Sequence, residues 1–108
     1  MIKIKKNTQY KKVYEKGKSV ADYNLVLFYK KTNSNDLRFG FTAAKRMKLA
    51  VDRNFIRRRL KEIVRLNENK IKEGYDIVFM ARLNATEADY KKLEKSFYKV
   101  LKRANLLK

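Results

Sequence analysis

The stretch that decides the fold is residues 43–74, AAKRMKLAVDRNFIRRRLKEIVRLNENKIKEG. At about 100° per residue, its apolar side chains share one arc of a helix. They are Ile56, Leu60, Ile63 and Val64. Asp52 before this run and Gly74 after it predict a helix over 53–72, with an aspartate N-cap and a glycine just past its end.

Beside the apolar arc the same helix carries a cationic arc of Asn54, Arg57, Arg58, Lys61 and Arg65. Repulsion between like charges four residues apart costs an isolated helix roughly a few tenths of a kcal/mol, and a cation near the helix start opposes the helix dipole. Because a ligand would offset these penalties, the arc predicts a polyanion-binding face. The alternative is an ordinary solvated face, which would normally mix charges of both signs.

Outward from this helix the flanking segments predict strands. Residues 75–81 are apolar on both faces, and residues 23–30 and 37–42 alternate in polarity or are rich in β-formers. The polar stretch 32–36 predicts a turn, so 23–30 and 37–42 are expected to pair as an antiparallel hairpin. The side chains expected to face the core from the first of these strands are Tyr23, Leu25, Leu27 and Tyr29.

Two further helices are expected at the ends of the chain. Asn7 or Thr8 is the expected cap of the first, which Gly17 ends. Thr86 and Asp89 resemble a capping box that opens the second. Its apolar stripe is Tyr90, Leu93, Phe97, Val100, Leu101 and Ala104.

The composition of the 108 residues points to one basic domain, 1–108, with a nucleic-acid partner. Lys and Arg number 29 against 11 Asp and Glu, which gives a formal net charge of +18. This charge is concentrated in three blocks, residues 1–18, 43–65 and 91–108. The chain has no His and no Cys, which excludes histidine bases, cysteine nucleophiles and zinc sites. A polyanion would neutralise such a charge, and nucleic acid is the first candidate.

The chain shows no signal for a membrane or for export. Its longest apolar run falls far short of the roughly 20 residues that a membrane-spanning helix needs, and no apolar segment follows the basic N-terminus. A cytoplasmic protein with no membrane partner is therefore expected.

Residues 37–62, LRFGFTAAKRMKLAVDRNFIRRRLKE, resemble the bacterial ribonuclease P protein subunit. The matching features are a hydrophobic residue followed by glycine, a basic loop, and a helix that opens with Arg-Asn and continues with basic residues. Residues 10–29, YKKVYEKGKSVADYNLVLFY, match the family's aromatic pair, basic-Gly and following strand. The chain departs from the family pattern at Ala44, Lys48 and Asp52, and it has Tyr10 and Tyr14 where Phe is common.

The resemblance implies an α/β fold (α+β, two layers) with a small mixed sheet packed by helices, in the order α-β-β-β-α-β-α. It is the ribosomal protein S5 domain 2-like fold, whose crossover through the central helix, between parallel strands, is left-handed. General rules for such connections favour the right-handed form. The residues themselves predict three strands, and the extra strand of the family's order could come from a split of 23–42.

The resemblance also implies a function, the removal of the 5′ leader from precursor tRNA in tRNA maturation. The RNA subunit of that endonuclease performs the chemistry with Mg²⁺ held mainly by RNA, and the protein binds this RNA and the precursor tRNA. The protein is then a non-catalytic subunit with no catalytic and no metal-binding residues. The chain's own lack of an assembled base or carboxylate pair fits that division.

Candidate RNA-binding residues follow from the basic loop and the helix: Lys45, Arg46, Lys48, Arg53, Asn54, Arg57, Arg58, Lys61 and Arg65. The single-stranded leader is expected in a cleft between the first helix and the open sheet face, at Tyr10, Tyr14, Val26 and Phe28. Aromatic side chains there could stack on bases. The alternative for the helix residues is a plain core stripe, with Val13 the first to be buried.

Two other functions compete with this hypothesis. A ribosomal or general RNA-binding protein would bind structured RNA without preferring a substrate that carries a leader. An autonomous nuclease would cleave RNA without an RNA subunit.

Overall fold

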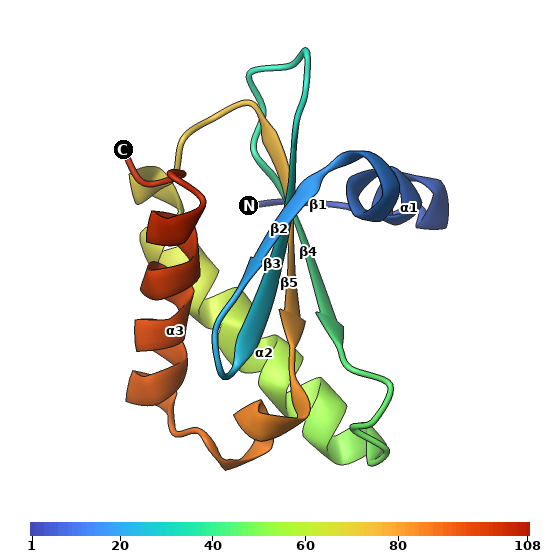
Figure 1. The fold of residues 1–108 in the computed structure, drawn as a ribbon, viewed down its shortest axis with the longest axis vertical. Helices are drawn as coiled ribbons and strands as arrows, with labels where there is room; N and C mark the ends of the chain where they lie inside the picture. Colours follow the sequence, from blue (N-terminus) through green and yellow to red (C-terminus); the bar gives the residue numbers. More distant parts are fainter.

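Five strands form one mixed sheet in the computed structural model, which describes residues 1–108 (Figure 1). In chain order they are β1 (Ile2–Lys3), β2 (Lys18–Ala21), β3 (Leu25–Lys31), β4 (Arg38–Ala43) and β5 (Tyr75–Ala81). Across the sheet the order is β1-β4-β5-β3-β2. β4 runs parallel to both β1 and β5, whereas β3 is antiparallel to β5 and to β2.

Three α-helices cover the sheet: α1 (Asn7–Lys16), α2 (Ala50–Asn67) and α3 (Tyr90–Arg103). There are also two short 3₁₀ helices. η1 (Glu68–Lys70) follows α2, and η2 (Leu83–Glu87) follows β5. Figure 1 shows α2 and α3 on one face of the sheet and α1 on the other. No helix has the length and apolar character needed to cross a membrane.

This architecture confirms the expected fold class. From α1 onward the elements follow the order α-β-β-β-α-β-α, with β1 added in front. α2 joins the adjacent parallel strands β4 and β5, as the resemblance implied. The left-handed sense of that crossover stays a prediction.

The main core lies between the sheet and the helices α2 and α3. Phe39, Phe41 and Phe79 stack across β4 and β5 with ring centroids 6.3–6.4 Å apart. The ring centroid of Phe97 of α3 lies 5.3 Å from that of Phe79. The apolar arc predicted for α2 is buried in this core, as are Leu93, Phe97, Val100 and Leu101 of the stripe predicted for α3.

α1 packs on the opposite face, around Val13, which is fully buried against Ile4 and Val78. Gly40 of β4 lies directly beneath the Tyr10 ring. The approach is so close that a Cβ atom at this position would be 2.5 Å from the ring. Tyr14 reaches β3, where its ring meets Phe28 edge-on at 4.8 Å. α1 therefore crosses the sheet from β4 to β3.

The predicted hairpin between 23–30 and 37–42 is wrong. β5 lies between β3 and β4, and it pairs with each of them over its length. The physical reason is burial, because a strand that is apolar on both faces is most stable in the centre of a sheet. The additional strands are β1 and β2, and neither comes from a split of 23–42.

Tyr23 also departs from its prediction. It precedes β3, and 70 % of its surface is exposed, whereas Leu25 and Leu27 are fully buried as expected. Because Tyr23 lies outside the paired part of the strand, the alternation of side chains along the strand does not decide which face it points to.

Gly17 ends α1 as predicted, because it is the C-cap and its backbone N–H bonds the Val13 carbonyl. The other predicted caps are corrected. α1 begins after Lys6, where the Gln9 side chain accepts hydrogen bonds from the backbone N–H groups of Lys5 and Lys6. α2 begins after Leu49, so Asp52 lies in the first turn, and it ends at Asn67. Gly74 has a φ of 85° but belongs to the turn before β5.

Asp89 caps α3 by accepting a hydrogen bond from the Lys92 backbone N–H at 2.8 Å, as a residue at the helix start should. Thr86 takes no part, because it lies in η2 and its hydroxyl donates to the carbonyl of Leu83.

Candidate nucleic-acid interface

The burial of α2 leaves its cationic arc facing outward. Ile56, Leu60, Ile63 and Val64 lie in the core, so the neighbouring side of the helix must be exposed or half-buried. That side carries Asn54, Arg57, Arg58, Lys61 and Arg65 as predicted. The helix thus separates an apolar side from a basic one.

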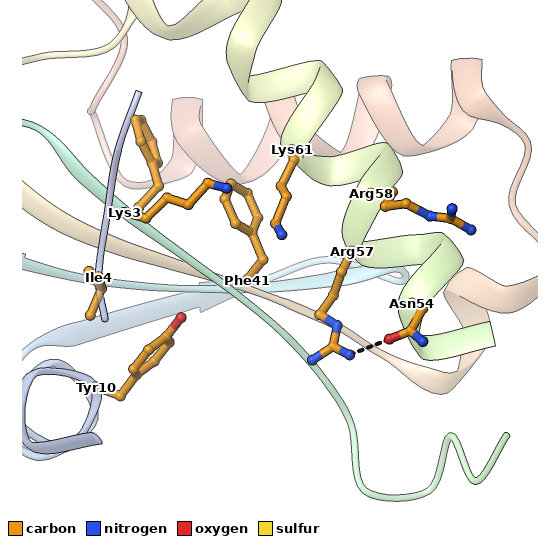
Figure 2. Close-up of a pocket in the computed structure, with 9 residues that line it drawn as sticks. Lys3, Ile4, Tyr10, Phe41, Asn54, Arg57, Arg58 and Lys61 are labelled. Atoms are coloured by element: carbon orange, nitrogen blue, oxygen red, sulfur yellow. Dashed lines mark hydrogen bonds between the residues drawn. The ribbon is translucent and has the colours of Figure 1, made fainter. Parts of the chain in front are cut away.

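Four of these five side chains line one cleft of about 520 Å³, which we name the α2 cleft. It opens between α2, the edge of β4, and the N-terminal segment with α1 (Figure 2). Its lining residues are Lys3, Ile4, Tyr10, Phe39, Phe41, Asn54, Arg57, Arg58 and Lys61. The cleft therefore combines an aromatic floor with cations contributed by two separate segments.

The cations of the α2 cleft are available to a ligand. Arg57 donates a hydrogen bond to the Asn54 side-chain oxygen at 2.6 Å, which holds its guanidinium without neutralising it. Arg58 and Lys61 have no hydrogen-bond or ion-pair partner within the molecule. In Figure 2, Arg57 and Lys61 extend from α2 into the cleft, whereas Arg58 extends away from Tyr10 at its rim.

Tyr10 forms the α1 side of the α2 cleft. Burial raises the pKa of Tyr10, and a hydrogen bond with the Phe41 backbone offsets part of that rise. The phenol therefore stays protonated at neutral pH and can act as a hydrogen-bond donor or acceptor. The structure thus places this predicted leader-contact residue beside the predicted RNA contacts of α2.

Arg65 is not in the cleft. Its guanidinium forms two hydrogen bonds with the Glu62 carboxylate, at 2.6 and 3.0 Å. This contact lowers the pKa of Glu62 and raises that of Arg65. Within the arc predicted for α2, Arg65 is the one cation that is paired with a carboxylate.

Arg59 has a structural role outside the cationic arc. Its guanidinium lies 4.4 Å from the centre of the Phe55 ring, and it donates to the Ala88 carbonyl at 3.3 Å. It therefore links α2 to the segment after η2.

The other predicted cations lie around the start of α2. Lys45, Arg46 and Lys48 are exposed in the loop after β4, and Arg53 is half-buried in the first turn of α2. Of these, Arg46 lines a second hollow of about 520 Å³, which we name the sheet groove. Its lining residues are Ala21, Val26, Ala44, Arg46, Met80, Arg82, Leu83 and Asn84.

The remaining leader-contact candidates lie on the open sheet face. Val26 lies in the floor of the sheet groove, opposite Met80 in the strand register. Tyr14 and Phe28 form their edge-on pair next to it, with 41 % of Tyr14 exposed. These residues make an apolar strip that runs from α1 into the groove.

Sequence reasoning missed several residues of both hollows. Lys3 and Ile4 enter the α2 cleft because β1 pairs with β4, and only the basic character of the N-terminal block hinted at this. Arg82 and Asn84 enter the sheet groove from the segment after β5. No local pattern marks them, since their position depends on β5 being central.

The carboxylates do not gather into a metal site. No cluster of three or more Asp, Glu, His or Cys side chains is placed to hold an ion.

Comparison with known proteins identifies the family. The family model described as Ribonuclease P matches residues 2–105. The chain belongs to this family. The Ribonuclease P protein component of Pelotomaculum thermopropionicum is 44 % identical over 103 residues, which covers 95 % of this chain and 92 % of that protein.

Solved structures of ribonuclease P proteins share the fold. The Staphylococcus aureus RNase P protein has a TM-score of 0.90 and 29 % identity, and the match covers 100 % of this chain and 99 % of that one. A second S. aureus structure, described as a mutant with defective mRNA degradation activity, has a TM-score of 0.89 and 30 % identity. That match covers 96 % of this chain and 88 % of the mutant.

Proposed function

We propose that this ribonuclease P family protein is the RNA-binding, non-catalytic subunit of a ribonuclease P holoenzyme. In this role it binds the catalytic RNA and the 5′ leader of precursor tRNA, and so assists removal of the leader in the cytoplasm. The observation that carries the proposal is the α2 cleft, where unpaired cations and an aromatic floor meet beside an apolar strip on the open sheet.

The cations of α2 suit the phosphates of the catalytic RNA. Arg57 and Arg58 each offer a planar fork that can hold a phosphate through two hydrogen bonds. Lys45, Lys48, Arg53 and Lys61 would add charge around them, and Asn54 can bond a base or a phosphate while it positions Arg57. Arg65 would contribute only after its bond to Glu62 is released.

The open sheet suits a single strand. Tyr10, Tyr14 and Phe28 present aromatic surface, and Val26 extends it into the sheet groove, where Arg46 and Arg82 can meet phosphates. Bases stack on aromatic side chains with about 1–3 kcal/mol each. A flexible leader could therefore run from the α2 cleft along this strip.

The chemistry would then lie with the RNA subunit. The protein has no histidine and no cysteine, and its carboxylates form no metal-binding cluster. We therefore assign Mg²⁺ mainly to the RNA. The protein's contribution is to bind and position the substrate.

Reconstitution tests this proposal. The protein is added to a bacterial ribonuclease P RNA at low magnesium, and cleavage of precursor tRNA is compared with cleavage by the RNA alone. We expect faster cleavage with protein and tighter binding of precursor than of mature tRNA. Equal rates with and without protein would contradict the proposal.

Two controls separate the competing functions. A general RNA-binding protein would bind precursor and mature tRNA equally well. The protein alone is also incubated with an mRNA fragment, since a related structure is described in terms of mRNA degradation. Cleavage without the RNA subunit would indicate an autonomous nuclease.

A further inference from the structure

The outer side of α3 carries a second surface of a single charge sign, which we name the α3 basic face. Its six members are all exposed: Lys91, Lys92, Lys95, Lys99, Lys102 and Arg103. At 100° per residue they occupy an arc of about 120° that contains no acidic residue. Along the helix axis they span about 18 Å, at roughly 1.5 Å per residue.

This arrangement has an electrostatic cost within the helix. Lys91, Lys95 and Lys99 follow one another at four-residue spacing, where like charges repel. None of the six cations forms an ion pair with a carboxylate of the molecule. Arg103 donates only to the backbone carbonyl of Ala21. An ordinary solvated helix face would mix signs and relieve this repulsion.

The α3 basic face is separate from the α2 cleft. α3 packs on β3 and β2, whereas the α2 cleft opens at the β4 side of the sheet. Tyr90, the first residue of α3, lies near Glu62 of α2, and its pKa is raised by burial and by the charges of Glu94 and Glu62. These carboxylates interrupt the positive surface, so one short RNA segment would not lie evenly across both.

The opposite side of α3 rules out insertion into a membrane as the purpose of this face. Leu93, Phe97, Val100 and Leu101 are fully buried in the core. A helix that binds a membrane surface needs such residues free to enter the lipid. Only the charges of α3 are left for a partner.

The residue types indicate what kind of polyanion fits. Five of the six cations are lysines, which act as point charges on flexible stems, whereas α2 is rich in arginine forks. Lysines suit contacts to phosphates along a backbone more than contacts to base edges. An RNA helix presents such phosphates, and its deep major groove hides the bases from side chains.

We propose that the α3 basic face binds the phosphate backbone of a helical segment of RNA, different from the segment held at the α2 cleft. The proposal rests on the proposed function, because the RNA in question is that of the ribonuclease P complex. The protein then bridges two RNA segments from opposite edges of its sheet.

Directed cleavage tests the placement. The chain has no cysteine, so one introduced cysteine can carry an iron–EDTA group at a single known place. The three variants are Lys95→Cys on α3, Val51→Cys at the start of α2, and Glu73→Cys as a control away from both surfaces. Each is bound to ribonuclease P RNA, and the cleaved nucleotides are mapped.

We expect Lys95→Cys to cut a helical segment of the RNA that Val51→Cys does not cut, and Glu73→Cys to cut weakly. The proposal would be overturned if position 95 cut the RNA no more strongly than position 73 while position 51 cut it strongly. That result would leave the proposed function intact. No cleavage from position 51 either, together with failed reconstitution, would overturn both.

A binding experiment tests the energetic contribution. The experiment compares two double variants. One is Lys95→Gln/Lys99→Gln on α3. The control is Lys72→Gln/Lys108→Gln, which removes the same amount of charge near the C-terminal end of the chain. Glutamine keeps helix propensity, so α3 should remain folded. We expect the α3 double variant to bind ribonuclease P RNA about tenfold more weakly or worse. The slope of the logarithm of its binding constant against the logarithm of salt concentration (the salt slope) should fall in magnitude by about two. The control double variant should change little in either quantity.

Equal effects of the two pairs would overturn the proposal, since they would show only the loss of net charge. A vesicle of anionic phospholipid provides the other comparison. Loss of vesicle binding in the α3 pair with unchanged RNA binding would assign the face to a membrane and overturn the proposal as well.

Discussion

Glu62 holds one of the arginines of α2 that the proposed function would otherwise make available to RNA. Its carboxylate holds Arg65 through two hydrogen bonds, and this contact lowers the pKa of Glu62. A carboxylate with a lowered pKa in the folded state contributes stability at neutral pH that is lost as the pH falls through that pKa. Protonation would therefore also release Arg65.

Glu62→Gln should imitate this release at neutral pH. We expect affinity for ribonuclease P RNA to rise several-fold and the salt slope to increase by about one, because Arg65 gains a phosphate contact. The measurement is a salt titration of the binding constant. A fall in affinity would show instead that Glu62 positions Arg65 for the RNA.

Tyr14 tests the leader strip at the level of one side chain. The residue is 41 % exposed and its ring meets Phe28 edge-on, so it can stack on a base without leaving its place. Tyr14→Ala should weaken binding of precursor tRNA to the holoenzyme roughly tenfold, the equivalent of about 1.4 kcal/mol of lost stacking. Mature tRNA is the internal control, and equal losses for both substrates would contradict the assignment.

At the scale of elements, periodicity predicted where most helices and strands lie but not which strands pair. Residues 23–30 and 37–42 have the pattern of a hairpin, and nothing within them shows that β5 separates them. The relevant signal was elsewhere, in the two apolar faces of 75–81. Very short strands such as β1 have too few residues for a period.

Helix boundaries were less predictable than helix positions. Asn7, Asp52 and Thr86 are residue types that favour caps, yet the helices begin elsewhere, because backbone contacts in the folded chain decide between nearby candidates. For the site, the cationic arc of α2 followed from its sequence. The meeting of that arc with Tyr10 and Lys3 depended on strand pairing and could not be predicted.

Gly17 tests the attachment of α1 to the sheet. A Cβ atom at this position would lie 2.5 Å from the backbone oxygens of both Val13 and Tyr29. Because neither oxygen can move without disturbing α1 or β3, Gly17→Ala should destabilise the protein by about 1–3 kcal/mol. Thermal unfolding measures this, with Lys16→Ala as the exposed neighbour, and an unchanged midpoint would contradict the packing of α1.

At the scale of the whole molecule, the excess of positive charge limits the stability of the folded protein. A net charge of +18 is carried on a body with a radius of gyration of 12.8 Å, so the folded state is destabilised by its own repulsion. Anions that bind the folded state but not the unfolded chain should offset this.

Sulfate or phosphate should therefore stabilise the protein more than chloride at equal ionic strength. At a concentration about 100 times the dissociation constant the gain is about 2.7 kcal/mol, which shifts the midpoint of a domain of this size by roughly 10–20 °C. Thermal unfolding in matched buffers checks this. Identical midpoints in the three salts would show that screening alone acts and that no anion site is occupied.

The most direct test of the central claim, that α2 holds the phosphates of the catalytic RNA, is the salt dependence of binding by Arg58→Gln. Arg58 lies at the rim of the α2 cleft and has no partner within the protein, so its removal changes little else. We predict a salt slope smaller by about one than that of the wild-type protein, and an affinity for ribonuclease P RNA several-fold weaker. A slope and affinity equal to those of Lys108→Gln would contradict the account.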